Sequence, residues 1–362
     1  MRILKLAIFI FSFCSVQAQV DPLLIGPLPF LIDEASGIEC SHPDSCWTHN
    51  DNNDSERLYL ISGSGAFLGQ RTLQDASQID YEDLALADDG RLFIGDFGNN
   101  ANDRQDLSIY ICSPSSSSGS LLAAEKIEFN LEDQTDFPPT NSNLNFDIEA
   151  MIYQDGFIYL FTRNRTIPQN GVSKMYRLDD SSGIQTATLQ GDFIGNSSPT
   201  YSSITAADIS PDGTRLALLT SGSLFLFHNL ESWPLISGDP IYNFFSFTRN
   251  FEGLSFIDNC TAYLVSESVP GIDGELFSLN TCDIISDLPE PELSIGLVYM
   301  DGLLTYKSSS ANLSFALFDN LGRTQLMKAL QGRIELPSNL APGMYILQYS
   351  NGSSSSSFRF KI

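Results

Sequence analysis

Short apolar runs separated by polar turns dominate the chain, and the stretch DYEDLALADDGRLFIGDFGNN at 80–100 shows the pattern clearly. An apolar run at 84–87 is followed by an Asp-Gly turn and by a second apolar run at 92–94. This pattern predicts an antiparallel hairpin, in which the start of the first strand lies beside the end of the second. Acidic residues therefore gather at the open end of the hairpin: Asp80, Glu82, Asp83 and Asp96.

The acidic hairpin recurs through residues 19–290, at intervals of roughly 45 to 65 residues. The first strands are DEASGIE (33–39), DYEDLAL (80–86), DIEAMIY (147–153), TAADIS (205–210) and FEGLSFI (251–257). Each is followed by a turn, a second strand and a third strand that carries an aromatic residue, and four of the five units add a fourth strand. Repeats of about four strands predict an all-β fold, the β-propeller.

Five blades are visible in this pattern, and the fifth lacks its fourth strand. The segment LLIGPLPFLI at 23–32 can supply that strand, which would close the ring and cover an exposed sheet edge. A six-bladed ring is the alternative, because the segment 101–146 is long enough to contain a weak blade. A two-sheet sandwich fits less well, since it does not explain an acidic position repeated in every unit.

Charge separates the chain into two parts. Residues 19–290 contain 40 acidic against 11 basic residues, a net charge of −29, whereas residues 291–362 contain 4 acidic and 6 basic residues. A domain this acidic does not bind nucleic acid through its phosphates, and it suits divalent cations. The Pro-rich stretch SDLPEPELS marks the change, so we predict a propeller over 19–284, a linker over 285–292 and a second domain over 293–362.

The N-terminal residues 1–18 have a basic start, an apolar middle and a small-residue end, which predicts a secretory signal peptide cleaved near Ala18. No other stretch is long and apolar enough to predict a transmembrane segment. We therefore expect a protein that is secreted or located at the outer cell surface.

Five cysteines follow the predicted leader, and an exported chain favours disulfides. Cys40 and Cys46 flank one turn. Cys260 begins a second strand and Cys282 ends a third, so antiparallel pairing places them side by side. We predict these two disulfides and a free Cys112.

In a propeller, the first strand of each blade lines the central channel. The repeats therefore place five acidic residues around one axis, with three more acidic residues as supports at the ends of the second strands. The predicted ring is Glu34, Glu82, Glu149, Asp208 and Glu252, and the predicted supports are Asp51, Asp96 and Glu267. Oxygen ligands without cysteine favour Ca²⁺ or Mg²⁺. Two alternatives stay open: acids that accept backbone N–H bonds, and carboxylate chemistry without a metal.

Two further residues are candidates for catalysis. His49 ends a second strand next to Asp51 and has the chemistry of a general base, although a histidine in such a place is more often a hydrogen-bonded rim residue. Arg163 and Arg165 lie near the channel mouth, where they would hold a small anionic substrate or form ion pairs with the acidic ring.

The stretches EASGIECSHPDSCWTHNDNNDSERLYLIS, DYEDLA, LFIGDFGNN, DIEAM and FEGLSF carry a resemblance over about 30–285. They resemble uncharacterised secreted propellers of Bacteroidetes-type bacteria, related to the SdiA-regulated and esterase-like phytase families. The layout is more distantly similar to the gluconolactonase and paraoxonase propellers, where a Glu that begins the first blade binds calcium on the axis. This resemblance implies that Glu34 is a calcium ligand.

The stretches LSFALFDNLGRTQL, GRIELPSNLAPGMYILQY and the terminal FRFKI resemble the C-terminal sorting domain of type IX secretion substrates over 293–362. The resemblance implies a small β-sandwich whose partner is the type IX secretion machinery. An ordinary accessory module of fibronectin type is the alternative.

Two functions remain open at this point. One is a metal-dependent hydrolase that cleaves a phosphoester or a lactone at the acidic face. The other is a non-catalytic propeller that binds a protein or glycan, in which calcium serves structure. The fold does not decide between them, because propellers support both.

Overall fold

The computed structural model describes residues 19–51, 54–114, 120–195, 198–228, 230, 236 and 240–286, and in the C-terminal part 296–300, 303–307, 314–319, 323–325, 328–330, 333–336, 340–341, 344–350 and 355–361. Two compact units are present, one from Ala18 to Ser286 and one comprising Met1–Gln17 with Asp287–Ile362. The predicted leader and residues 287–292 of the predicted linker lie outside the described residues.

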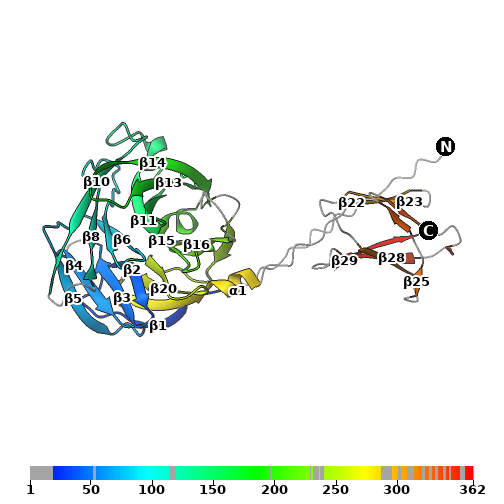
Figure 1. Cartoon of the computed structure of the whole chain (residues 1–362), viewed down its shortest axis with the longest axis horizontal. Coiled ribbons are helices and arrows are strands. Elements are labelled where there is room, and N and C mark those ends of the chain that lie inside the picture. The colour runs from blue at the N-terminus through cyan, green and yellow to red at the C-terminus, as the bar shows by residue number, and fades with distance from the viewer. Residues whose placement is uncertain are drawn as a thin grey trace. The chain divides into compact units, whose positions relative to one another are not determined.

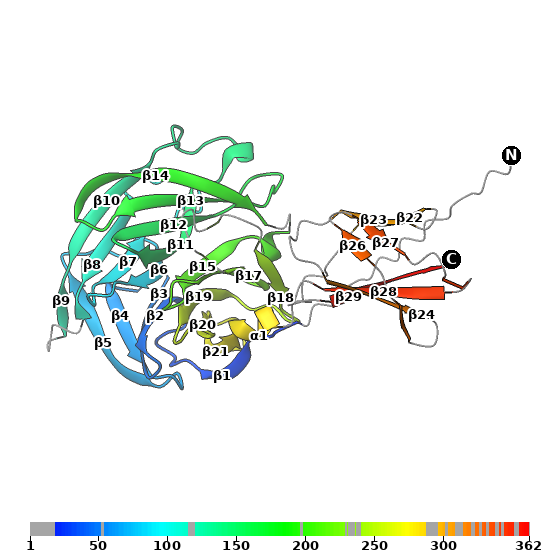
Figure 2. The same ribbon diagram turned by 45° about the vertical axis from the view of Figure 1, so that its right-hand side comes forward.

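The first unit is a β-propeller, as the repeat pattern predicts, and its sheets surround one axis (Figures 1 and 2). Blade 1 comprises β2 (Ala35–His42), β3 (Ser45–Asn50), β4 (Arg57–Ile61) and β5 (Phe67–Gln74). Blade 2 comprises β6 (Tyr81–Leu86), β7 (Leu92–Asp96), β8 (Ser108–Cys112) and β10 (Glu125–Leu131). Blade 3 comprises β11 (Asp147–Gln154), β12 (Phe157–Arg163), β13 (Val172–Asp179) and β14 (Gly183–Ile194). Blade 4 comprises β15 (Ile204–Ile209), β16 (Arg215–Thr220), β17 (Ser223–His228) and β18 (Ile241–Phe244). Blade 5 comprises β19 (Phe251–Phe256), β20 (Thr261–Ser266), β21 (Glu275–Asn280) and β1 (Leu23–Pro27).

The innermost strands form a closed cycle in which β2, β6, β11, β15 and β19 each contact the next, and β19 contacts β2. The N-terminal strand β1 pairs antiparallel with β21, so the segment expected to complete the last blade does so. The described part of the long segment 101–146 supplies β8, β10 and the short β9 (Leu121–Ala123), which pairs with β5. Strands β10 and β14 pair in parallel and join blades 2 and 3 into one sheet.

The core lies between neighbouring blades, where buried side chains of one sheet face those of the next. Phe93 of blade 2 and Leu160 of blade 3 belong to one such cluster, and Phe161 of blade 3 and Phe225 of blade 4 belong to another. This packing fixes the blades relative to one another, because interiors this dense leave little room for sliding.

Both predicted disulfides are present, Cys40–Cys46 and Cys260–Cys282, and Cys112 is a buried free thiol. Burial raises the pKa of the Cys112 thiol to about 12, so it is unreactive at neutral pH. The short helix α1 (Thr281–Ser286) ends the first unit. No helix in the ranges given above has the length and apolar character needed to cross a membrane.

The second unit is the predicted small β-sandwich. One sheet contains β22 (Gly296–Met300), β23 (Leu303–Lys307), β27 (Arg333–Glu335) and β26 (Lys328–Leu330). The other contains β25 (Thr324–Gln325), β24 (Ser314–Asp319), β28 (Met344–Ser350) and β29 (Ser355–Lys361). Ile334 of the first sheet and Leu317 and Leu347 of the second are fully buried.

Candidate functional site

A β-bulge at the same place in every inner hairpin shapes one mouth of the channel. The pairing register between the first and second strands slips after Ala35, Tyr81, Ile148, Ile204 and Phe251. A bulge leaves its extra residue unpaired and re-aims the side chain. The residues that follow the slip form the bulge layer of the mouth: Ser36, Glu82, Glu149, Thr205 and Glu252.

Two further layers lie beside each other next to the bulge layer, since the Asp51 N–H donates to the Glu34 carbonyl and the Glu267 N–H to the Asn250 carbonyl. The residue two positions earlier lies on the same face of the strand, since side chains alternate. These residues form the entry layer: Glu34, Asp80, Asp147, Ser203 and Asn250. On each second strand, one residue pairs with the residue just before the slip, and the residue that follows it belongs to the exit layer. The exit layer is Asp51, Phe97, Arg163, Ser221 and Glu267.

The register therefore corrects the predicted ring in blade 4. The bulge position there is Thr205, and Asp208 lies three residues further along β15, paired with Ala217. At about 3.3 Å per residue, this places Asp208 roughly 10 Å further down the channel. The bulge position in blade 1 is Ser36, and Glu34 stands in the entry layer.

Three carboxylates from blades 1 and 2 come together at the mouth. One oxygen each of Asp51, Asp80 and Glu82 lies within 4.8 Å of the others, a spacing that would hold a metal ion. Burial and then the charge of Asp80 raise the pKa of Asp51 to about 8. Burial and then Glu149 raise the pKa of Glu82 well above its usual range.

The Glu82 carboxyl is the least compensated member of this cluster. Its residue is only 6% exposed, and none of the described residues donates a hydrogen bond to its side chain. Gly98 makes room for it, because a Cβ at that position would lie 2.1 Å from Glu82 Oε1 and 2.4 Å from Asp80 Oδ2. A buried carboxylate without a donor is costly unless a cation completes it.

Asp96 supports this cluster from below and does not enter it. Its Oδ1 accepts hydrogen bonds from the Asp80 N–H at 3.0 Å and from Arg104 Nη2 at 3.2 Å. The residue is fully buried at the end of β7. It therefore positions the backbone of Asp80, which agrees with a supporting place in the mouth.

Blade 3 compensates its acids with arginines of its own. Arg163 Nη1 lies 3.0 Å from Glu149 Oε2 and 4.0 Å from Glu252 Oε2. Arg165 lies 2.6 Å from Asp147 Oδ2 and 2.9 Å from Glu149 Oε1. Burial and then Glu149 nevertheless raise the pKa of Asp147 to about 7. The mouth thus has one half in which arginines form ion pairs with the acids, and one half, around Asp80 and Glu82, whose carboxyls form no ion pair with the described residues.

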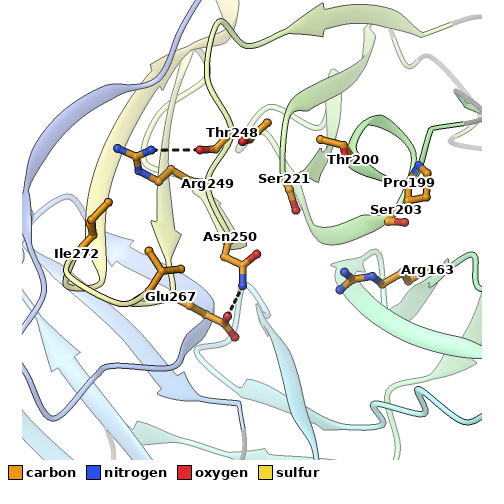
Figure 3. Close-up of a pocket in the computed structure, with 11 residues that line it drawn as sticks. Arg163, Pro199, Thr200, Ser203, Ser221, Thr248, Arg249, Asn250, Glu267 and Ile272 are labelled. Atoms are coloured by element: carbon orange, nitrogen blue, oxygen red, sulfur yellow. Dashed lines mark hydrogen bonds between the residues drawn. The ribbon is translucent and has the colours of Figure 1, made fainter.

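A pocket of about 460 Å³ opens beside these groups, lined mainly by blades 4 and 5 (Figure 3). Ser203, Ser221 and Thr200 come from the blade 4 side, and Asn250 and Glu267 from blade 5. Asn250 Nδ2 donates a hydrogen bond to Glu267 Oε2 at 2.6 Å. Burial raises the pKa of Glu267, and Glu34 adds to this effect.

Asp83, which directly follows Glu82, links the inner strands of blades 2, 3 and 4. This fully buried carboxylate accepts hydrogen bonds from the N–H groups of Leu84, Met151 and Ala207. Asp208 accepts similar bonds from the N–H groups of Ile209 and Phe256. Both acids thus accept N–H bonds from inner strands of other blades. Accepting backbone N–H bonds is one of the two alternatives left open for the ring acids, and Asp208 is the ring residue that follows it.

His49 does not reach the mouth. The residue is 0% exposed, its Nδ1 contacts the Asn50 carbonyl at 3.0 Å, and its ring packs edge-on against Tyr81. Burial lowers its pKa to about 4, so it is neutral at pH 7. A substrate in the mouth has no access to this imidazole, so we do not retain His49 as a catalytic base.

Sequence reasoning placed Arg165 near the mouth but left Asp80 and Asp147 out of the predicted ring and its supports, although a signal for them was present. The pairs Asp80-x-Glu82 and Asp147-x-Glu149 have the two-residue spacing that puts both side chains on one face of a strand. That spacing, rather than a single acidic position per repeat, identifies the mouth.

No protein-family model matches this chain, and no curated protein matches it. Among solved structures, it is similar to a PQQ-bound aldose sugar dehydrogenase from Streptomyces coelicolor, with 9% identity, a TM-score of 0.43, and coverage of 73% of this chain and 98% of that one. A candidate gluconolactonase shows 12% identity, a TM-score of 0.37, and coverage of 73% and 90%. Hsv2 from Kluyvelomyces marxianus shows 10% identity, a TM-score of 0.31, and coverage of 64% and 76%. At these values the similarities carry no argument about activity.

Proposed function

We propose that the propeller binds a divalent cation, Ca²⁺ or Mg²⁺, at its mouth and is a metal-dependent hydrolase of a phosphoester or a lactone. The observation that carries the proposal is the Glu82 carboxyl, which is buried, lacks a donor among the described residues, and lies in one cluster with Asp51 and Asp80. Three carboxylate oxygens from two segments of the chain are the kind of donor set that these hard cations prefer.

The residues of the chain fit such an ion. Asp51, Asp80 and Glu82 would hold it, Asp96 would fix the backbone of Asp80, and Gly98 would leave the space that the carboxylates occupy. A bound divalent cation would polarise an ester or phosphoryl oxygen and lower the pKa of a water molecule. Glu149 and Glu252, held by Arg163, would face the same mouth from the opposite side.

The test is a cation titration of the full-length chain. We expect Ca²⁺ to raise the melting temperature of the parent. At a Ca²⁺ concentration a hundredfold above the dissociation constant, the free energy of unfolding should rise by about 2.7 kcal/mol. Glu82→Gln keeps the shape of the side chain and removes its charge, so this gain should disappear. Glu128→Gln, an exposed substitution on β10, is the matched control. If Ca²⁺ and Mg²⁺ each stabilise the parent and Glu82→Gln equally, the proposed cation site is wrong.

A substrate screen separates catalysis from binding alone. Phosphoester and lactone substrates should be cleaved by the calcium-loaded parent and not after EDTA treatment. Cation binding without any turnover would favour the alternative, a non-catalytic propeller that binds a protein or glycan with calcium as a structural ion.

Export is the second part of the proposal. We propose that residues 293–362 address the chain to the type IX secretion machinery and that the mature protein is secreted or displayed at the outer surface. The two disulfides of the propeller suit an oxidising compartment, and Arg323 of the Asx-x-x-Gly-Arg motif contacts Asp319 Oδ2 at 2.7 Å. A chain that ends before residue 293 should fold and remain in the periplasm. Its appearance in the medium would contradict the assignment.

A further inference from the structure

The acidic pattern of the entry layer is interrupted at blades 4 and 5, which line the 460 Å³ pocket. Ser203 and Asn250 occupy the entry-layer positions that are acidic in the other blades. Ser221 occupies the exit-layer position held by Asp51 in blade 1. The two uncharged entry-layer positions are therefore neighbours around the ring, and both line the cavity.

The hydroxyl groups of this pocket are available to a ligand. Thr200, Ser203, Ser221 and Thr248 line it, and their side-chain oxygens make no hydrogen bond in the described part of the chain. Figure 3 shows Ser221, Asn250 and Arg163 directed toward the same space from three sides. Hydroxyl groups both donate and accept, so the lining can satisfy a ligand that itself carries several hydroxyl groups.

The charges around the pocket argue against an anionic ligand. Arg163 is committed to Glu149 at 3.0 Å, and Arg249 to Glu275 at 3.2 Å. The carboxyl of Glu267 adds a negative group to the lining. Among the described lining residues no positive charge lacks an acidic partner, so an incoming phosphate or carboxylate would have to displace an existing ion pair.

We infer that this pocket binds a neutral, polyhydroxylated, sugar-like group of the ligand. The volume lies within the range of pockets that hold small molecules, and the lining supplies hydroxyl, amide and carboxyl partners without an aromatic platform. The inference rests on the proposed function for its link to hydrolysis. Of the two substrate classes proposed there, a pocket for a neutral group favours an uncharged ester such as a lactone over a phosphoester. It also corrects the expectation that Arg163 holds an anionic substrate.

The experiment uses the full-length chain with Ca²⁺ and ligand-observed saturation-transfer NMR. The probes are the neutral sugars D-glucose, D-galactose and D-mannose, with D-gluconate as the anionic and D-glucosamine as the cationic counterpart. Ser203→Asp and Ser221→Asp each restore the acid found in other blades. Ser181→Asp, in the exposed turn after β13, adds the same charge elsewhere and is the control.

At least one neutral sugar should bind saturably and more tightly than gluconate. Each pocket variant should weaken it by about tenfold, comparable to losing a good hydrogen bond, and Ser181→Asp should leave it unchanged. If an Asp variant melts below the parent by more than a few degrees, the double variant Ser203→Ala, Ser221→Ala carries the test with the same expected loss.

Three results would overturn the inference: tighter binding of gluconate, glucosamine binding more than tenfold tighter than glucose, or neutral-sugar binding that none of the pocket variants changes. Absence of binding by all three neutral sugars would overturn it as well. Repeating the titrations in EDTA separates the two proposals. Sugar binding without any Ca²⁺-induced rise in melting temperature would contradict the proposed cation site and leave the sugar pocket standing. A Ca²⁺-induced rise without sugar binding would contradict the sugar pocket and leave the cation site standing.

Discussion

Blades 2 and 4 have the same inner hairpin and the same bulge, yet they present opposite chemistry to the mouth. Blade 2 carries Asp80, Glu82 and Asp83 where blade 4 carries Ser203, Thr205 and Ala206. In blade 4, Thr205 Oγ1 is satisfied internally, because it donates to the Phe251 carbonyl at 2.6 Å. In blade 2, the Glu82 carboxyl receives no hydrogen bond from the described residues. The comparison shows that the fold sets the positions, while single side chains decide whether they carry acidic or uncharged groups.

The largest expected effect comes from replacing Asp83 of blade 2 with alanine, the residue that blade 4 has at the same position, Ala206. Asp83→Ala removes the acceptor of the Met151 and Ala207 N–H groups, which leaves buried donors unpaired. We expect the free energy of unfolding to fall by about 3 kcal/mol, measured by urea denaturation. Asp89→Ala, in an exposed turn, should change it by less than about 0.5 kcal/mol. A loss below about 1 kcal/mol for Asp83→Ala would show that the axis does not depend on this carboxylate.

The next test breaks the built-in compensation of blade 3. Arg163→Gln leaves Glu149 with Arg165 as its remaining ion-pair partner among the described residues. Without added metal we expect a loss of about 2 kcal/mol, less than for a fully buried pair because Arg163 is partly exposed. The stabilisation by Ca²⁺ should become larger than in the parent. Arg91→Gln, which breaks an ion pair with Asp180 at the turn end of the blade 2 hairpin, should leave the cation response unchanged. An unchanged response in Arg163→Gln would contradict the division of the mouth into two halves.

A smaller effect is expected from filling the space beside the cluster. The new methyl group of Gly98→Ala would meet Glu82 and Asp80, so these carboxyls must move. We expect the apparent affinity for Ca²⁺ to fall about tenfold, which corresponds to ~1.4 kcal/mol, measured from the metal dependence of the melting temperature. Gly69→Ala is the control, since the nearest atom to its added Cβ is 4.0 Å away. Equal affinities in the two variants would place the ion elsewhere.

The smallest effect concerns the other end of the channel, where blade 4 carries Asp208 and blade 2 carries Ala85. Burial and then Asp208 raise the pKa of Glu39 well above its usual range, and burial raises the pKa of Asp208 to about 7. The folded protein therefore binds these protons more tightly than the unfolded chain, whose glutamate pKa is about 4.3. Stability must fall as pH rises from about 4 through the folded-state pKa values.

Glu39→Gln should make that fall shallower. We expect the parent, in EDTA, to have a lower free energy of unfolding at pH 8 than at pH 5, and the variant to show a smaller difference between the two values. Glu128→Gln serves again as the exposed control. Identical pH dependence in Glu39→Gln and parent would mean that Glu39 titrates alike in the folded and unfolded states.

The sequence predicted the blades and the two disulfides because their signals are local. Alternating apolar runs, Asp-Gly turns and the position of each cysteine at a strand end all act within one hairpin. The closing strand was also predictable, since Leu23–Pro27 stands before the first blade and the last blade lacks a strand.

The mouth was harder to predict because its chemistry depends on a one-residue slip in register. A bulge moves the following side chains to the opposite face, and no residue type marks its position. Aligning TAADIS by its only acid therefore put Asp208 in the ring, whereas the register puts Thr205 there. Asp83 was assigned to the acidic rim for the same reason, and it lies on the axis.

The disulfide of the last blade has a mechanical consequence. Any tension on the chain beyond residue 286 reaches the ring through α1. It would load the bond from the Thr281 N–H to the Cys260 carbonyl and then the pair Thr261 and Asn280, where β20 and β21 begin their pairing. Cys260 and Cys282 are covalently joined immediately outside that pair. The load therefore passes into β20 without unzipping β21, and the N-terminal strand β1, which rests on β21, keeps its place when the C-terminal unit is pulled.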